Sequence, residues 1–327
     1  MTSPAAEPAS EVPPPPSSPT AAASVPIPAP ARRRITGAIW AALAIVYVVW
    51  GSTYLGIRVV VETMPPFLSA GARFVVAGLL LAAIIAWRQG LGALKTDRRQ
   101  LGSAALVGVL LLLGGNGLVV LAETSIASGL AALLIAVVPA WVVLLKACFG
   151  ERPTLGGLAG VLLGLAGLAV LTLPGLTGAV HMGGVLLVIC ATLMWSTGSF
   201  SSSRLPMPKN PFTASAYEML AGGLACAALG VIRGEQHGLD LGDVSTRSWV
   251  AWAYLVVFGS LIAFTAYAWL LQTAPLSLVA TYAYVNPVVA VLLGALILGE
   301  ALTLPIVLGG AIVVLGVGLI VSTERRG

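Results

Sequence analysis

Long apolar runs, separated by short polar breaks, follow one another from residue 35 to residue 321. A helix of about 20 apolar residues crosses the hydrocarbon core of a bilayer. A spanning β-strand would alternate apolar and polar residues instead, and the run from Leu106 to Leu113 does not alternate. Because helices and closed barrels are the only backbones that satisfy their own hydrogen bonds in lipid, we expect an all-α polytopic membrane protein.

The composition excludes other classes of protein. Hydrophobic residues make up 58% of the 327 residues and charged residues only 9%, whereas a soluble domain is about a quarter charged. A soluble enzyme, a DNA-binding domain and a disordered protein are therefore excluded. The three cysteines lie in apolar runs, without the spacing of a metal site or a disulfide framework.

We predict ten transmembrane helices from the apolar runs. Their ranges are 35–57, 67–87, 101–122, 125–148, 155–173, 182–202, 211–232, 249–271, 276–298 and 304–321. Residues 1–34 are rich in Pro and Ala and have no aromatic residue, so we expect a disordered cytoplasmic tail there.

The basic residues predict the orientation of the chain, because Lys and Arg gather in cytoplasmic loops. With a cytoplasmic N-terminus, 13 of the 17 basic residues lie inside, Arg58, Arg233 and Arg247 lie outside, and Arg73 lies within a span. We therefore expect a multi-pass protein of the plasma (inner) membrane with both termini in the cytoplasm.

The two halves of the chain repeat one another. Trp50 corresponds to Trp195 at an offset of 145 residues, and Gly150-Glu151 corresponds to Gly299-Glu300 at an offset of 149. Five spans in each half is an odd number, so the second half enters the membrane from the opposite side. That arrangement is the inverted repeat of many secondary transporters. The predicted repeats are residues 35–174 and 181–322.

Three charged residues lie at or near membrane depth, where each is a functional hypothesis because burying a charge is costly. Arg73 in the second span and Glu218 in the seventh occupy corresponding positions, 145 residues apart. They either recognise a charged substrate or couple a proton, or they form a structural ion pair. Glu123, near the outer end of the third span, either shares a helix face with Asn116 or reaches interfacial water.

Two prolines indicate where a binding site would lie. Pro139 in the fourth span and Pro287 in the ninth each remove a backbone donor, so we expect both helices to be kinked. Kinks at corresponding positions of two halves indicate a site near the midplane. Asn286, directly before Pro287, bonds either the freed carbonyl groups or a substrate.

Aromatic and hydroxyl side chains lie on the spans around that site. Such groups suit a pocket for an amphipathic organic solute, although Trp and Tyr are also typical of the membrane interface. Glycines at Gly160, Gly164, Gly167, Gly309 and Gly316 predict close helix packing. The candidate residues of the substrate path are Trp50, Thr53, Tyr54, Asn116, Trp195, Tyr267, Tyr282 and Asn286.

Motifs of enzymes are missing from the sequence. It has no phosphate-binding GxxxxGKS, no HExxH and no Cys/His cluster. We expect no catalytic residue, no metal, no cofactor and no nucleic-acid partner. The expected partners are the lipid bilayer, a small-molecule substrate and, if transport is coupled, protons.

Five segments resemble the EamA-type branch of the drug/metabolite transporter superfamily. They are residues 50–58 (WGSTYLGIR), 71–74 (GARF), 115–123 (GNGLVVLAE), 128–133 (SGLAAL) with Pro139, and 281–287 (TYAYVNP) leading to Gly299-Glu300. The resemblance runs from residue 35 to the end of the chain. It implies two five-helix repeats and alternating access around a central cavity. Members export amino acids, metabolites or drugs, often with proton coupling proposed.

The expected function is therefore that of a secondary transporter which exports small organic metabolites, amino acids or drugs, either with or without proton coupling. An importer of the same fold is one alternative. The other is a membrane sensor or assembly subunit that does not transport. A polar cavity at the midplane would favour transport.

Overall fold

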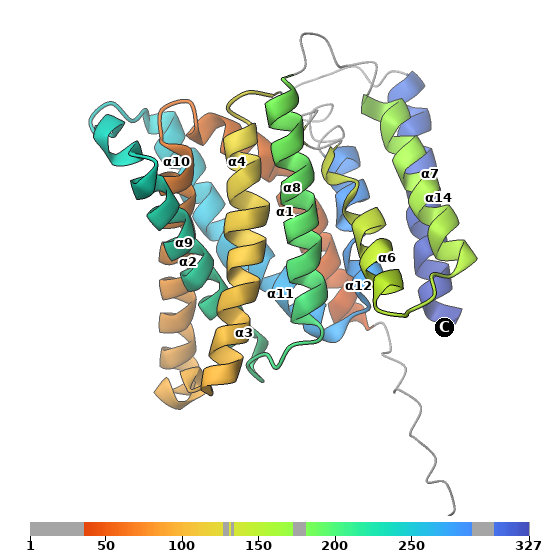
Figure 1. The fold of residues 1–327 in the computed structure, drawn as a ribbon, viewed down its shortest axis with the longest axis horizontal. Coiled ribbons are helices and arrows are strands. Elements are labelled where there is room, and N and C mark those ends of the chain that lie inside the picture. Colours follow the sequence, from red (N-terminus) through yellow and green to blue (C-terminus); the bar gives the residue numbers. More distant parts are fainter. Residues whose placement is uncertain (1–35, 127–130, 132–133, 173–180, 290–303, 327) are drawn as a thin grey trace, which may run out of the picture. The chain divides into compact units, whose positions relative to one another are not determined.

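The structure, a computed structural model, describes residues 36–126, 131, 134–172, 181–289 and 304–326. Within these ranges every regular element is a helix (Figure 1). Six helical stretches are long and apolar enough to cross a membrane: Gly37–Val60, Pro66–Gln89, Arg98–Ala122, Met182–Ser202, Pro211–Ile232 and Thr246–Thr273. The prediction of an all-helical membrane protein is confirmed, while the expected tail 1–34 lies outside the described residues.

Four of these stretches are continuous α-helices: α1 (Gly37–Val60), α2 (Pro66–Gln89), α8 (Met182–Ser202) and α9 (Pro211–Ile232). The bounds of α8 and α9 coincide with the predicted spans. Pro211 starts α9 directly after Asn210, whose side chain accepts a hydrogen bond from the backbone N–H of Phe212. Proline in the first turn and Asn at the N-cap are strong start signals, which is why the sequence located this helix.

The other two long stretches contain π-helical segments at corresponding positions. α3 (Arg98–Gly108) continues through the π-helix Val109–Gly117 into α4 (Leu118–Ala122). α10 (Thr246–Tyr254) continues through the π-helix Leu255–Phe264 into α11 (Thr265–Thr273). Bonding from residue i to i+5 is rare in helices and is frequent at functional sites.

Four shorter apolar helices fall within the four remaining predicted spans: Val138–Cys148, Leu155–Gly167, Leu276–Val289 and Val307–Ile320. They belong to α6 (Val138–Cys148), α7 (Leu155–Thr172), α12 (Leu276–Val279) with the helical residues 282–289, and α14 (Leu304–Arg326). Residues 290–298 of the predicted ninth span and parts of the fourth lie outside the described residues.

The two prolines lie in different helical settings. Pro139 lies in the first turn of α6, behind a turn at residues 136–137, so it starts a helix where its missing N–H costs no bond. Pro287 lies within the helical residues 282–289, and the described residues stop at 289, so the kink expected there stays a prediction. The chain leaves the helix earlier, at Ala280-Thr281. The Thr281 hydroxyl lies 2.5 Å from the Tyr47 hydroxyl and 2.6 Å from the Leu278 carbonyl oxygen, and such bonds compete with helical ones.

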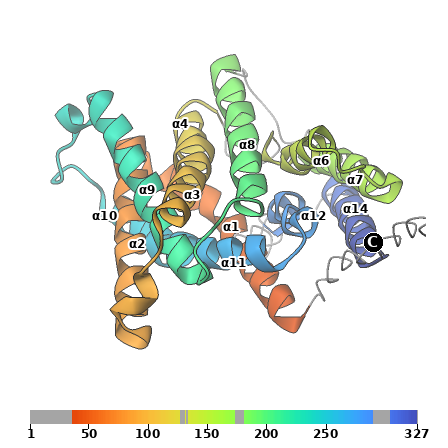
Figure 2. The same cartoon turned by 60° about the horizontal axis from the view of Figure 1, so that its bottom comes forward.

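α2 packs against α9, its counterpart in the other half (Figures 1 and 2). A Cβ atom on Gly71 would lie 2.8 Å from the carbonyl oxygen of Gly223, and one on Gly78 would lie 3.1 Å from that of Ala216. The start of α2 therefore meets the later part of α9, so the helices run antiparallel. At the repeat offset of 145, Gly71 corresponds to Ala216 and Gly78 corresponds to Gly223. The two contacts therefore join equivalent positions, as in an interface with two-fold symmetry.

α7 and α14 repeat this arrangement and lie side by side in both views (Figures 1 and 2). A Cβ atom on Gly160 or on Gly167 would lie 2.9 Å from the carbonyl oxygen of Gly316 or Gly309, respectively. At the offset of 149, Gly160 corresponds to Gly309 and Gly167 corresponds to Gly316, so these two contacts also join equivalent positions. The predicted packing role of these glycines is confirmed.

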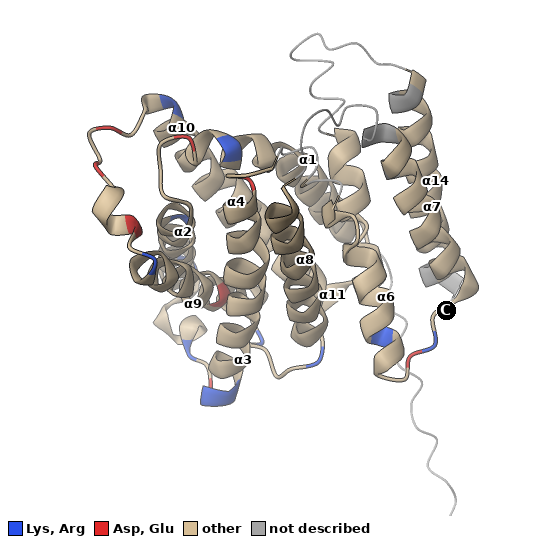
Figure 3. Cartoon of the chain, turned by 45° about the horizontal axis from the view of Figure 1, so that its top comes forward, with Lys and Arg blue, Asp and Glu red and all other residues tan. Residues whose placement is uncertain are grey.

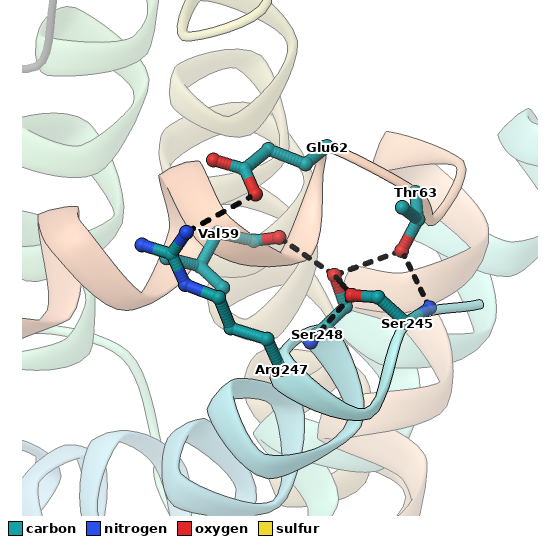
Figure 4. A network of polar contacts seen from close by, with 6 residues as sticks. All are labelled: Val59, Glu62, Thr63, Ser245, Arg247 and Ser248. Atoms are coloured by element: carbon teal, nitrogen blue, oxygen red, sulfur yellow. Dashed lines mark hydrogen bonds and ion pairs between the residues drawn. The ribbon is translucent and has the colours of Figure 1, made fainter.

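Charged residues gather near the ends of the helices (Figure 3). At the end where α1 stops, the Ser248 hydroxyl donates to the Val59 carbonyl oxygen at 2.8 Å and accepts from the Thr63 hydroxyl at 2.8 Å (Figure 4). Arg247 lies 3.9 Å from the Glu62 carboxylate. These contacts join the end of α1 to the start of α10.

A second polar network lies where α6 ends. The Glu151 carboxylate contacts both Lys146, at 3.9 Å, and Arg204. Lys146 also donates to the Ser277 hydroxyl at 2.9 Å. The network thereby links the ends of α6 and α8 to the start of α12.

Candidate functional site

A cavity of about 70 Å³ lies between helices of both halves. A water molecule needs roughly 10–15 Å³ of such space, so the cavity is several times larger than a single water site. On α1 its lining residues are confined to positions 50–57, in the second half of the helix. Its walls are Trp50, Thr53, Tyr54, Ile57, Arg73, Phe74, Leu112, Gly115, Asn116, Val119, Ile135, Val138, Ala191, Thr192, Trp195, Gly259, Phe264 and Tyr282.

Most residues selected from the sequence for a substrate path lie on this cavity. They come from α1, from the first π-helix, from α8 and from the helical residues 282–289. Arg73 of α2 joins them. Those that line the cavity are Trp50, Thr53, Tyr54, Asn116, Trp195 and Tyr282.

The rings of Trp50, Trp195 and Tyr282 form one wall of the cavity, and the ring of Tyr267 packs behind them. The ring centroids of Trp50, Trp195, Tyr267 and Tyr282 lie 4.9 to 5.7 Å apart in five contacting pairs. Trp195 donates to the Tyr267 hydroxyl at 2.9 Å, and Trp50 donates to the Gly259 carbonyl oxygen of the second π-helix at 3.1 Å. Because protein groups satisfy both indole N–H donors, these rings form an ordered wall rather than an anchor in the membrane interface.

Arg73 and Asn116 supply the polar part of the cavity. The Arg73 side chain is 5% exposed, and its Nη2 donates to the Asn116 Oδ1 at 2.8 Å. Its Nε has no hydrogen-bond partner among the described residues. The guanidinium also lies over the Phe74 ring, 4.1 Å from the centroid. A cation with an unused donor thus lies on a mainly apolar cavity.

Gly115 allows the aromatic wall to approach the first π-helix. A Cβ atom there would lie 2.5 Å from Cε3 of Trp195, closer than side chains can pack. Asn116 follows directly and lies on the cavity. Glycine is a poor helix former, and the adjacent glycines Gly114 and Gly115 lie within the π-helix Val109–Gly117.

Two candidates lie behind the cavity wall rather than on it. Tyr267 is 1% exposed, and its hydroxyl lies 2.6 Å from that of Ser199. Asn286 is also 1% exposed, and with its amide nitrogen turned toward them it donates to the carbonyl oxygens of Tyr47 and Tyr282, at 3.2 and 3.0 Å. Bonding to backbone carbonyls is one of the two roles that the sequence left open.

The ion pair between Arg73 and Glu218 does not form. Arg73 bonds to Asn116, whereas Glu218 is fully buried and neither of its carboxylate oxygens has a partner among the described residues. Gly108 of α3 packs directly on the Glu218 backbone. α3 and α9 therefore cross closely at Glu218.

Glu123 does not reach interfacial water. It follows α4 directly, is fully buried, and both its carboxylate oxygens lack a hydrogen-bond partner among the described residues. The Arg58 guanidinium donates to its backbone carbonyl oxygen at 2.6 Å. The interpretation as a solvated residue at the membrane surface is therefore wrong.

Several cavity residues were not selected from the sequence. Ile57, Phe74 and Leu112 resemble any other apolar residue of a span, and nothing marks them. Gly259 carried a usable signal, because it corresponds to Gly114 at the repeat offset of 145. In the described part of the chain, no group of three or more His, Cys, Asp or Glu residues could hold a metal ion.

A bundle of membrane-length helices around a cavity shared by two halves is the architecture of a membrane transporter. Comparison with known proteins gives the family. The model described as "EamA-like transporter family" matches residues 35–173 and 182–322. The chain belongs to this family and is a membrane transporter of the EamA kind, built from two repeats.

Individual relatives agree with this assignment. The Escherichia coli (strain K12) protein named "Uncharacterized inner membrane transporter YedA" is 39% identical over 267 residues, which cover 81% of this chain and 84% of the relative. The Streptantibioticus cattleyicolor protein named "Probable terminal-alkyne amino-acid exporter" is 29% identical over 290 residues, 88% and 94% of the two chains. A crystal structure with 21% identity covers 89% of this chain and 99% of its own with a TM-score of 0.72, which shows the same fold. The inner-membrane relatives and the apolar helices together indicate a multi-pass plasma-membrane protein.

Proposed function

We propose that this transporter exports small organic metabolites, amino acids or drugs by alternating access. The observation that carries the proposal is the cavity, which combines a wall of aromatic rings with the amide of Asn116 and the guanidinium of Arg73. Such a lining suits an amphipathic organic solute. The relative named as an amino-acid exporter supports the direction of transport.

The proposed architecture is ten transmembrane helices in two inverted five-helix halves, residues 35–174 and 181–322. The antiparallel contacts of α2 with α9 and of α7 with α14 support this inversion, because each pair consists of counterparts. The positive-inside rule supports cytoplasmic termini.

With that orientation the cavity lies toward the outer side. The contacts of Glu151 with Lys146 and Arg204, and of Lys146 with Ser277, then lie at the cytoplasmic end. We propose that this network closes the cytoplasmic side in the present state and breaks when the transporter turns inward.

Glu218 is the proposed carrier of the coupling proton. An ionised carboxylate at this fully buried position has no donor or cation to compensate it among the described residues, and burying such a charge is costly. The group therefore favours carrying a proton while it is enclosed, and releasing it when a change of state exposes it. Glu123, buried in the same way, is the second candidate.

Purified protein in liposomes tests both the transport and its coupling. A thermal-shift screen against amino acids, sugars, purines and cationic drugs first selects solutes that stabilise the protein. We expect flux of such a solute to rise with an imposed pH gradient, and Glu218→Gln to lose that dependence. Glu62→Gln, which changes an exposed carboxylate, should retain it. Full pH-dependent flux through Glu218→Gln would refute the coupling, and absence of flux for every stabilising solute would refute transport.

A further inference from the structure

We infer that the cavity binds the carboxylate group of an organic anion, with Arg73 as its charge partner and Asn116 as the residue that orients Arg73. This inference rests on the proposed export function and names the class of substrate.

The charge of the cavity is the first step. Arg73 is the only charged residue among its described lining residues, which include no Asp or Glu. A guanidinium stays charged in proteins, and a buried charge without a counter-ion is costly. A substrate anion would supply the counter-ion that the described residues do not.

The free donors of Arg73 are the second step. The bond to Asn116 uses one N–H of Nη2, while Nε has no partner among the described residues. An arginine presents five N–H donors in a planar fork that matches a carboxylate with two parallel bonds. The amide oxygen of Asn116 fixes the plane of this fork without neutralising its charge.

The carboxylates around α2 do not bind the guanidinium of Arg73. Glu218 of α9 has no bond to it. Glu235, in the loop after α9, instead accepts from the backbone N–H groups of Phe67 and Leu68, at 3.0 and 2.9 Å, and so caps the N-terminus of α2. Glu123 lies after α4, where Arg58 approaches its backbone.

The rest of the lining defines the body of the substrate. The rings of Trp50, Trp195, Tyr282 and Phe264 and the side chains of Leu112 and Val138 lie around the polar pair. Such walls favour an apolar or aromatic skeleton. The expected class is therefore a small organic carboxylate with an apolar body.

Matched ligands test the inference by thermal shift and by titration of the purified full-length protein. The aromatic set is 3-phenylpropanoate, 3-phenylpropanamide and 3-phenylpropylamine, and the aliphatic set is butanoate, butanamide and butylamine. We expect at least one carboxylate to bind about tenfold or more tightly than its amide and amine, the effect expected for bonds to a charged group. Arg73→Gln should reduce carboxylate binding to the level of the amide. Arg88→Gln, an exposed arginine on the same helix, is the matched control and should change nothing.

Arg73→Lys keeps the charge but loses the fork, so it should retain a weaker preference for the carboxylate, and it serves as the reporter if Arg73→Gln does not fold. Failure of both carboxylates to bind, equal binding of the amide or amine, or an unchanged preference in Arg73→Gln would overturn the inference. If the protein transports neutral or cationic solutes and Arg73→Gln does not change that flux, the substrate is not an organic anion. The proposed export would still hold. Absence of flux for every solute, with carboxylate binding intact, would refute export alone.

Discussion

Single residues determine how the cavity is shaped. Gly115 lets α8 bring Trp195 onto the cavity, and Asn116 next to it holds Arg73. A side chain at position 115 would therefore act on the wall of the cavity through contact with the indole ring.

Gly115→Ala tests this role. The added Cβ would lie 2.5 Å from Cε3 of Trp195, so the ring must move, and overpacking of this kind costs about 1–3 kcal/mol. We expect ligand affinity and flux to fall at least tenfold, measured by titration and in liposomes. Gly102→Ala in the same span meets nothing within 4 Å and should behave like the wild type. Equal ligand affinity for the two variants would contradict the role of Gly115.

The cavity residues that could be predicted from the sequence are those whose side chains are unusual within a membrane span. Trp50, Trp195 and Asn116 stand out in an apolar span, and all three lie on the cavity. The surroundings of Glu123 could not be predicted, because its burial depends on neighbours from other helices, such as Arg58 of α1. The same holds for Glu235, which caps a helix 167 residues away in the sequence.

At the scale of elements, glycine faces hold counterpart helices together. A Cβ atom on Gly316 of α14 would lie 2.8 Å from the Gly164 backbone nitrogen and 2.9 Å from the Gly160 carbonyl oxygen. Two residues further along, a Cβ atom on Gly318 would meet nothing within 4 Å. The helix therefore offers a crowded and an open glycine for comparison.

We expect Gly316→Ala to destabilise the protein by about 1–3 kcal/mol, the usual cost of overpacking, since backbone atoms of α7 must move. Gly318→Ala should be neutral or slightly stabilising, because Ala is the better helix former. Thermal unfolding of both variants in detergent measures the difference. A lower midpoint for Gly318→Ala than for Gly316→Ala would show that the α7–α14 contact does not depend on this glycine.

Helix bounds could be predicted where proline and polar caps mark them, as at Pro211, but the form of a helix could not. The π-helices lie inside apolar runs with no break in hydropathy, and only the glycines Gly114, Gly115 and Gly259 hint at them. The break at Ala280-Thr281 has a side-chain cause that involves Tyr47 of α1. Such contacts exist only after the helices have packed.

At the scale of the whole molecule, the distribution of Lys and Arg predicts the orientation of the chain in the membrane. With cytoplasmic termini, Cys148 at the end of α6 lies inside, and the loop that contains Gln236, between α9 and α10, lies outside. Cys148 is exposed at the protein surface and Cys226 is buried, so the wild type provides its own control.

A membrane-impermeant maleimide should label Gln236→Cys in intact cells. The wild type should be labelled only after the membrane is opened, because its exposed Cys148 faces the cytoplasm and Cys190 lies within a span, where the reagent does not reach. Mass spectrometry of the labelled peptides identifies the site. Labelling of Cys148 in intact cells would show that the orientation is opposite to the proposed one.

The pairing of counterpart helices has an evolutionary consequence. Interfaces such as α2 with α9 are self-complementary, like those that hold two identical subunits together. In a dimer of identical five-helix subunits, every substitution appears twice, so a cation added on one side of the cavity would be duplicated on the other. In a single chain the two halves are free of that constraint. Arg73 and Glu218, which occupy equivalent positions, could then diverge into a cation on the cavity and an acid outside it.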